Sequence, residues 1–138
     1  MANIDVLEEA LSFITDHPEQ HQQAYWNCES GACFAGHIAL LNGYRPAYSV
    51  ISETVIDGLV LGPDETSYRT PHLAASLAGL TDVESELLFV AGNTRDEIAL
   101  MIKDMRNGED ITKTWEATRF HDDTGWRYAS RRVEDDEL

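Results

Sequence analysis

The stretch GACFAGHIALL, residues 31–41, decides the fold, because its side chains are apolar on nearly every side of a helix. A helix of this composition belongs in the middle of a hydrophobic core rather than on its surface. Ser30 precedes the stretch as a candidate N-cap, and Asn42-Gly43 follows it as a candidate end. We therefore predict a central helix over residues 31–41, against which the rest of the chain packs.

Further helices are predicted on both sides of this stretch. Apolar residues at helical spacing indicate an amphipathic helix capped by Asn3, and His17-Pro18 ends it because proline disfavours α geometry in the residue before it. Later in the chain, Thr70-Pro71 is typical of a helix start, and capping boxes begin at Thr81 and at Thr94. The predicted spans are residues 4–16, 70–78, 82–91 and 95–106.

Between these helices the pattern changes to that of β-structure. Runs of β-branched and apolar residues at 54–56 and 59–61 flank Asp57-Gly58, which predicts a two-residue hairpin turn. Residues 62–69 are expected to form a loop. After residue 108 the pattern weakens, and the apolar residues there favour a last strand or a segment that wraps across the core.

These elements predict an α+β fold that is mainly α, a compact helical domain with one small β-hairpin. The 138 residues are enough for one domain, which we place at residues 1–133. Residues 134–138 are expected to be an acidic, disordered tail.

The charge balance excludes several classes of function. Twenty-five Asp and Glu against ten Lys and Arg give a formal net charge of −15, so the chain should be repelled by nucleic acid and by anionic membranes, and a partner should carry a basic patch. The chain shows neither a signal peptide nor an apolar run long enough to span a bilayer. We therefore expect a cytoplasmic protein with reduced thiols and no membrane partner.

Several of these sequence elements resemble a family of small actinobacterial and actinobacteriophage proteins of unknown function. The shared pieces are His17-Pro18-Glu19, Trp26-Asn27-Cys28, the Ala-Cys-Phe-Ala-Gly run at residues 32–36, the Gly-Leu-Thr turn at 79–81 and the helix start at Thr94. The resemblance covers roughly residues 4–106. It implies a compact protein of the cytoplasm, in a phage-infected host if phage-encoded, and it implies no activity.

Both cysteines and three of the five histidines fall within one short window, residues 17–37. Cys28, Cys33, His37 and His21 are the candidate ligands of a structural zinc ion, because thiolate and imidazole are the groups that zinc prefers. Their spacing is not that of a zinc finger, so we expect core packing and no cofactor, with a zinc-stabilised domain as the alternative.

A reactive cysteine is a further alternative. Near the start of the central helix, the helix dipole would lower the pKa of the Cys33 thiol, and His37 one turn later can act as a base. No partner that would orient His37 is evident, and Cys28 and Cys33 lack the Cys-x-x-Cys spacing of a redox pair. A cysteine-dependent enzyme is therefore less favoured than a non-enzymatic protein.

DNA binding and DNA mimicry are the remaining hypotheses. Residues 73–81 with the helix after them are typical of a helix-turn-helix unit, but residues 70–94 contain no Lys or Arg, which excludes contact with phosphate. A DNA mimic needs carboxylates arrayed on one face, whereas the acids here are spread through the chain. Mimicry stays a minor alternative.

The C-terminal region contains the candidate partner-binding residues. Aromatic residues and arginines, the side chains that anchor protein interfaces, are interleaved there. The competing interpretation is that these rings clamp the chain end onto the core. The six residues are Trp115, Arg119, Phe120, Trp126, Arg127 and Tyr128.

Together these observations predict a small, acidic, non-enzymatic protein of the cytoplasm that binds another protein. The resemblance adds the expectation of a phage accessory factor that binds a host protein.

Overall fold

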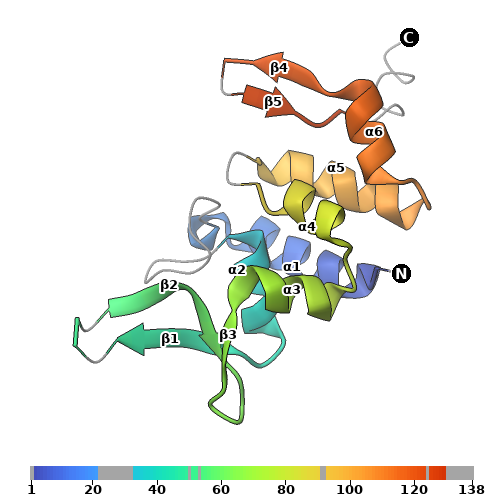
Figure 1. Ribbon diagram of the computed structural model, residues 1–138. Coiled ribbons are helices and arrows are strands. Elements are labelled where there is room, and N and C mark those ends of the chain that lie inside the picture. The colour runs from blue at the N-terminus through green and yellow to red at the C-terminus, as the bar shows by residue number, and fades with distance from the viewer. Residues whose placement is uncertain are drawn as a thin grey trace.

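The computed structural model describes residues 2–21, 33–49, 51–52, 54–90, 93–123 and 125–129. Six α-helices, one 3-10 turn and two small antiparallel sheets form the described part, which confirms an α+β fold that is mainly α (Figure 1). The helical elements are α1 (Ile4–Asp16), η1 (Pro18–Gln20), α2 (Phe34–Leu41), α3 (Thr70–Ala78), α4 (Asp82–Leu88), α5 (Arg95–Arg106) and α6 (Ile111–Thr118). The strands are β1 (Arg45–Ser49), β2 (Thr54–Leu61), β3 (Ser67–Arg69), β4 (Phe120–Asp122) and β5 (Gly125–Arg127).

The core is built around α2, as the apolar stretch at residues 31–41 predicts. Phe34, Ala35 and Ile38 are fully buried in the main hydrophobic cluster, and α2 packs against both α1 and α3. The helix begins at Phe34 rather than at residue 31, because Cys33 is its N-cap. The predicted cap Ser30 lies outside the described residues.

The capped helices form as predicted. α1 spans Ile4–Asp16 with Asn3 as its N-cap, and both capping boxes are complete: Thr81 pairs with Glu84, and Thr94 pairs with Glu97. α4 ends at Leu88, three residues before its predicted end. The side-chain amide of Asn93 donates to the Leu87 and Leu88 carbonyl oxygens at 2.7 and 3.1 Å, so it satisfies acceptors that another helical turn would use.

The predicted Asp57-Gly58 hairpin is wrong. Both residues lie inside β2, which runs without a turn from Thr54 to Leu61 and pairs with β1 on one side and β3 on the other. The register moves from Pro46↔Val60 to Tyr48↔Val55, so β2 carries extra residues at a bulge there. Gly58 has φ +86°, a backbone conformation that suits a G1 bulge as well as a turn. The expected loop over residues 62–69 also ends in a strand, β3.

The chain after residue 108 forms a helix and a second hairpin instead of a single strand or a wrap. Asp110 caps α6 by accepting from the Thr112 backbone N–H at 2.9 Å. The buried side of α6 includes Thr114 and Thr118. These polar residues interrupt the helical spacing of apolar residues from which a helix is predicted. β4 and β5 then pair at the end of the molecule opposite the β1–β2–β3 sheet (Figure 1).

No helix among the described residues is long and apolar enough to cross a bilayer. The predicted domain over residues 1–133 stays a prediction, and the predicted acidic tail at 134–138 lies outside the described residues.

Gly58 provides a test of the bulge. Gly58→Ala should lower the free energy of unfolding by about 1–2 kcal/mol, because a Cβ is unfavourable at positive φ. Gly58→Asn should lower the free energy of unfolding by less, since asparagine tolerates positive φ better than alanine does. Urea unfolding of both variants measures the difference, and equal stability of Gly58→Ala and the wild type would contradict a bulge with this backbone.

Candidate partner-binding site

The six aromatic and arginine residues predicted to bind a partner lie on α6 and on the β4–β5 hairpin, but they divide into two sets. Trp115, Arg127 and Tyr128 are half-buried or buried, whereas Arg119, Phe120 and Trp126 are exposed. The structure therefore contains both the clamp and the exposed surface that the sequence presents as alternatives.

The clamp holds the end of the hairpin on α5 and α6. Tyr128 is 4% exposed, and its hydroxyl donates to the Oδ2 atom of Asp104, a fully buried carboxylate on α5, at 2.6 Å. Burial raises the pKa of Tyr128, and the hydrogen bond to Asp104 raises it further. The Thr118 hydroxyl lies against the Ala129 carbonyl oxygen. The segment directly after β5 is thus attached at two consecutive residues, 128 and 129.

Arg127 adds an ionic contact to the clamp. Its Nη1 atom lies 3.0 Å from Oε1 of Glu97, and its Nε atom lies 3.2 Å from Oδ2 of Asp122. The Arg127 and Glu97 side chains are only 13% and 12% exposed, so water screens this pair less than a surface salt bridge. Glu97 also closes the Thr94 capping box, and the hairpin is thereby tied to the first turn of α5.

The other three residues and His121 are exposed, and we name this set the aromatic hairpin surface: Arg119, Phe120, His121 and Trp126. His121 pairs with Trp126 on one face of the hairpin, whereas Phe120 pairs with Arg127 on the other. Phe120 is 49% and Trp126 is 59% exposed. The Arg119 guanidinium lies over the indole at 5.6 Å from its centroid, and the His121 ring, opposite Trp126 in the strand register, meets it edge-on at 5.2 Å. Contacts on two sides restrict the indole while leaving more than half of it accessible.

Sequence reasoning missed Asp104 and Glu97, the acidic residues that hold the clamp. Asp104 follows Met101 by three positions, which places it on the inner side of α5 with Ile98 and Met105. An acidic residue on an apolar helix face signals a buried polar contact, and this signal is present in the sequence.

The predicted zinc ligands are only partly described. Cys33 is 1% exposed in the main core cluster, and its sulfur accepts from the Gly36 backbone N–H at 3.5 Å. The Nε2 atom of the buried His37 lies 2.8 Å from the Gln20 carbonyl oxygen. A carbonyl only accepts, so Nε2 carries the proton and a metal bond at His37 would have to use Nδ1. Cys28 lies outside the described residues, and His21 follows η1.

Among the residues that the structure describes, no three His, Cys, Asp or Glu side chains are grouped to hold a metal ion. The four-residue zinc set therefore stays a prediction, because one of its members is not described.

The environment of Cys33 is the opposite of that of a nucleophilic thiol. Burial raises its pKa to about 11, although backbone N–H groups of the first helical turn lower it in part. Desolvation of the thiolate outweighs the helix dipole that the sequence suggested. At neutral pH the thiol is protonated.

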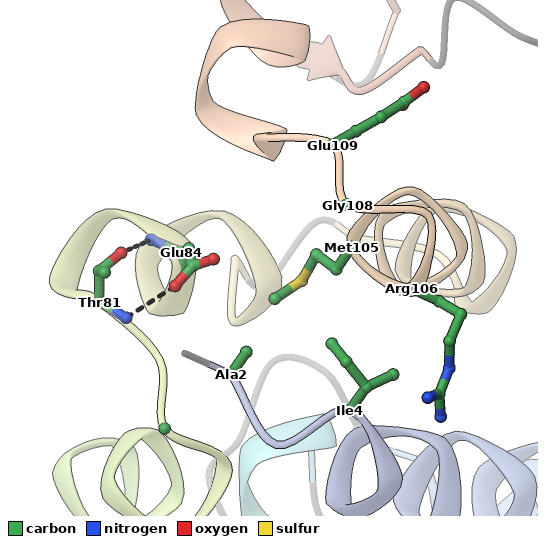
Figure 2. Close-up of a pocket in the computed structure, with 9 residues that line it drawn as sticks. Ala2, Ile4, Thr81, Glu84, Met105, Arg106, Gly108 and Glu109 are labelled. Carbon is green, nitrogen blue, oxygen red and sulfur yellow. Dashed lines mark hydrogen bonds between the residues drawn. The ribbon is translucent and has the colours of Figure 1, made fainter.

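A separate cleft of about 470 Å³ lies between the start of α1, the start of α4 and the end of α5 (Figure 2). Met105 extends into it toward α4. Two of the charged residues at its edge have partners within the protein: Glu84 accepts from the Thr81 backbone N–H at 2.9 Å, and Arg106 contacts Asp5 at 2.9 Å. Among the described lining residues, Ala2, Ile4 and Met105 are apolar.

Comparison of the chain with protein-family models, with curated proteins and with solved structures found no significant match.

Native Cys33 should be unreactive. In a Cys28→Ser background, a pKa of about 11 instead of 9.0 lowers the thiolate fraction at pH 8 by about a hundredfold. A thiol reagent should therefore modify Cys33 slowly until urea unfolds the chain. Because the folded state holds this proton more tightly, the Cys33 contribution to stability is complete below pH 9 and is lost as the pH rises toward 11. Rapid native modification at pH 8 would contradict this environment.

The clamp predicts unequal effects of two neighbouring substitutions. Tyr128→Phe removes a buried hydrogen bond to a carboxylate and should lower the free energy of unfolding by about 1–3 kcal/mol. Phe120→Ser changes an exposed side chain and should have little effect. Thermal unfolding of both variants tests this, and the clamp is refuted by equal losses.

Proposed function

We propose that this chain is a non-enzymatic protein of the cytoplasm that binds a protein partner through the aromatic hairpin surface. The observation that carries the proposal is the contrast between neighbouring side chains of one hairpin. Tyr128 and Arg127 attach the hairpin to α5 through buried polar contacts. Trp126, two residues before Tyr128, and Phe120, the register partner of Arg127, stay exposed.

This contrast supports binding, because leaving large aromatic rings exposed costs the folded protein stability. Exposed Trp and Phe rings forgo the burial that normally stabilises a small domain, and a hairpin of two short strands is marginal without packing. Here the polar clamp holds the hairpin in place without burying those rings. Rigid, accessible Trp and Arg side chains are the residues that dominate binding energy at protein interfaces.

The charge of the chain supports a protein partner rather than nucleic acid. The phosphates of a nucleic acid would be repelled by a chain of net charge −15. A protein partner with a basic face would be attracted by the same charge. The role of a phage accessory factor acting on a host protein rests on the actinobacterial resemblance of the Trp-Asn-Cys and Ala-Cys-Phe-Ala-Gly segments.

The Cys33 environment favours a non-enzymatic role over a cysteine-dependent one. A nucleophilic cysteine needs a thiolate near neutral pH, and burial moves the pKa of Cys33 in the other direction.

The proposal is tested by affinity capture from actinobacterial cells with three baits. These are the wild type, Phe120→Ser/Trp126→Ser, and Ile51→Ser as a matched control. Ile51 is 95% exposed and lies in the turn between β1 and β2, at the other end of the molecule. We expect the wild type and Ile51→Ser to capture one protein partner saturably, and we expect the hairpin variant not to capture it. Calorimetry with the purified partner then measures the loss, which should exceed about tenfold.

Failure to capture any saturable partner contradicts the proposal, and so does a partner that the hairpin variant retains. Circular dichroism of each bait separates loss of binding from loss of fold.

A further inference from the structure

A second apolar feature lies beside the hairpin, on α4. Val83 and Leu87, four residues apart, share one side of α4. Val90 lies two residues past the end of the helix and lines one cavity together with Leu87. Val83 is 45% and Val90 is 49% exposed, and Leu87 is half-buried. We name these three residues the α4 stripe. Val83 and Leu87 on the helix face, followed by Val90, form an apolar row of the kind against which another helix packs.

The α4 stripe is continuous with the aromatic hairpin surface. Leu87, Val90 and Trp126 together line a cavity of about 50 Å³, whose remaining walls are Asn93, Met101, Trp115 and Tyr128. Trp126, which is 59% exposed, forms one wall, so the cavity lies directly beneath the surface that a partner would cover. The terminal methyl group of a partner side chain that packs against Val90 and Trp126 would fill it.

Charge identifies the kind of partner. Residues 70–94, which include the whole of α3 and α4, contain no Lys or Arg. On α4 itself, Asp82 and Glu86 are exposed beside the stripe, and Glu84 is half-buried in its capping box. A partner that covers the stripe would therefore meet only negative charges from this helix, so its flanking side chains must be basic.

We propose that the α4 stripe and Trp126 dock a basic, amphipathic helix presented by the protein partner. The proposal rests on the proposed function and names the chemistry of the partner. Apolar residues of the incoming helix pack along Val83, Leu87 and Val90, and one of them anchors between Val90 and Trp126. Its lysines and arginines lie over Asp82 and Glu86.

The probe is a synthetic helix of about 18 residues in which leucine recurs every three or four positions and lysine fills the rest. Two controls are a scrambled peptide of the same composition and a peptide with glutamate in place of lysine. At about 0.15 M salt, non-specific attraction to the acidic chain is screened. We expect the amphipathic lysine peptide to bind the full-length protein and to shift the amide signals of the α4 stripe and the indole N–H signal of Trp126.

Variants of exposed residues complete the test without threatening the fold. Val83→Ser/Val90→Ser should weaken binding by about tenfold or more, and Glu86→Lys should weaken it through charge repulsion. Ile51→Ser, the matched control at the far end of the molecule, should leave the affinity unchanged. The proposal is overturned if the scrambled peptide binds as tightly, if the glutamate peptide binds better, or if the valine variant binds like the wild type.

Failure of the helix-docking proposal is distinguishable from failure of the proposed function. A partner captured through Phe120 and Trp126 whose binding is indifferent to Val83, Glu86 and Val90 would overturn the helix-docking proposal and leave the proposed function standing. Absence of any partner would overturn the proposed function, whatever the peptide does.

Discussion

The hydrogen bond between the Tyr128 hydroxyl and the buried Asp104 carboxylate is the contact on which the candidate site depends. A carboxylate without exposure needs donors, because an unsatisfied charge in the core is costly. Tyr128 supplies one only if the chain returns from β5 to α5. That requirement positions the hairpin, and it decides which aromatic rings are buried and which remain accessible.

Two surfaces follow from this arrangement. The clamp leaves Trp126 above a small cavity that α4 helps to line, so the aromatic hairpin surface and the α4 stripe meet at Val90. The aromatic hairpin surface contributes aromatic rings and Arg119. The α4 stripe contributes apolar side chains that are flanked by Asp82 and Glu86. Rigid anchors beside an apolar ridge give the pattern of a binding interface, in which few residues contribute most of the affinity.

Local chemistry predicted the helices with complete caps, whereas elements that depend on tertiary contacts were misjudged. Asn3, Thr81 and Thr94 mark helix starts by their own hydrogen bonds. Asp57-Gly58 is compatible with both a turn and a bulge, and pairing of β2 with two strands selects the bulge. α6 escaped prediction because threonines occupy its buried face. The six candidate residues were found as one group, since sequence cannot show that Asp104 and Glu97 hold some of them and not others.

The most direct test of the account is amide hydrogen exchange of the wild-type protein over residues 111–129, with α5 as internal reference. A clamped hairpin predicts protection of α6 and of the paired amides of β4 and β5 that is lost only in the same cooperative opening as α5. Exchange of the hairpin at the rate of an unstructured peptide, while α5 stays protected, would contradict a fixed platform for Trp126.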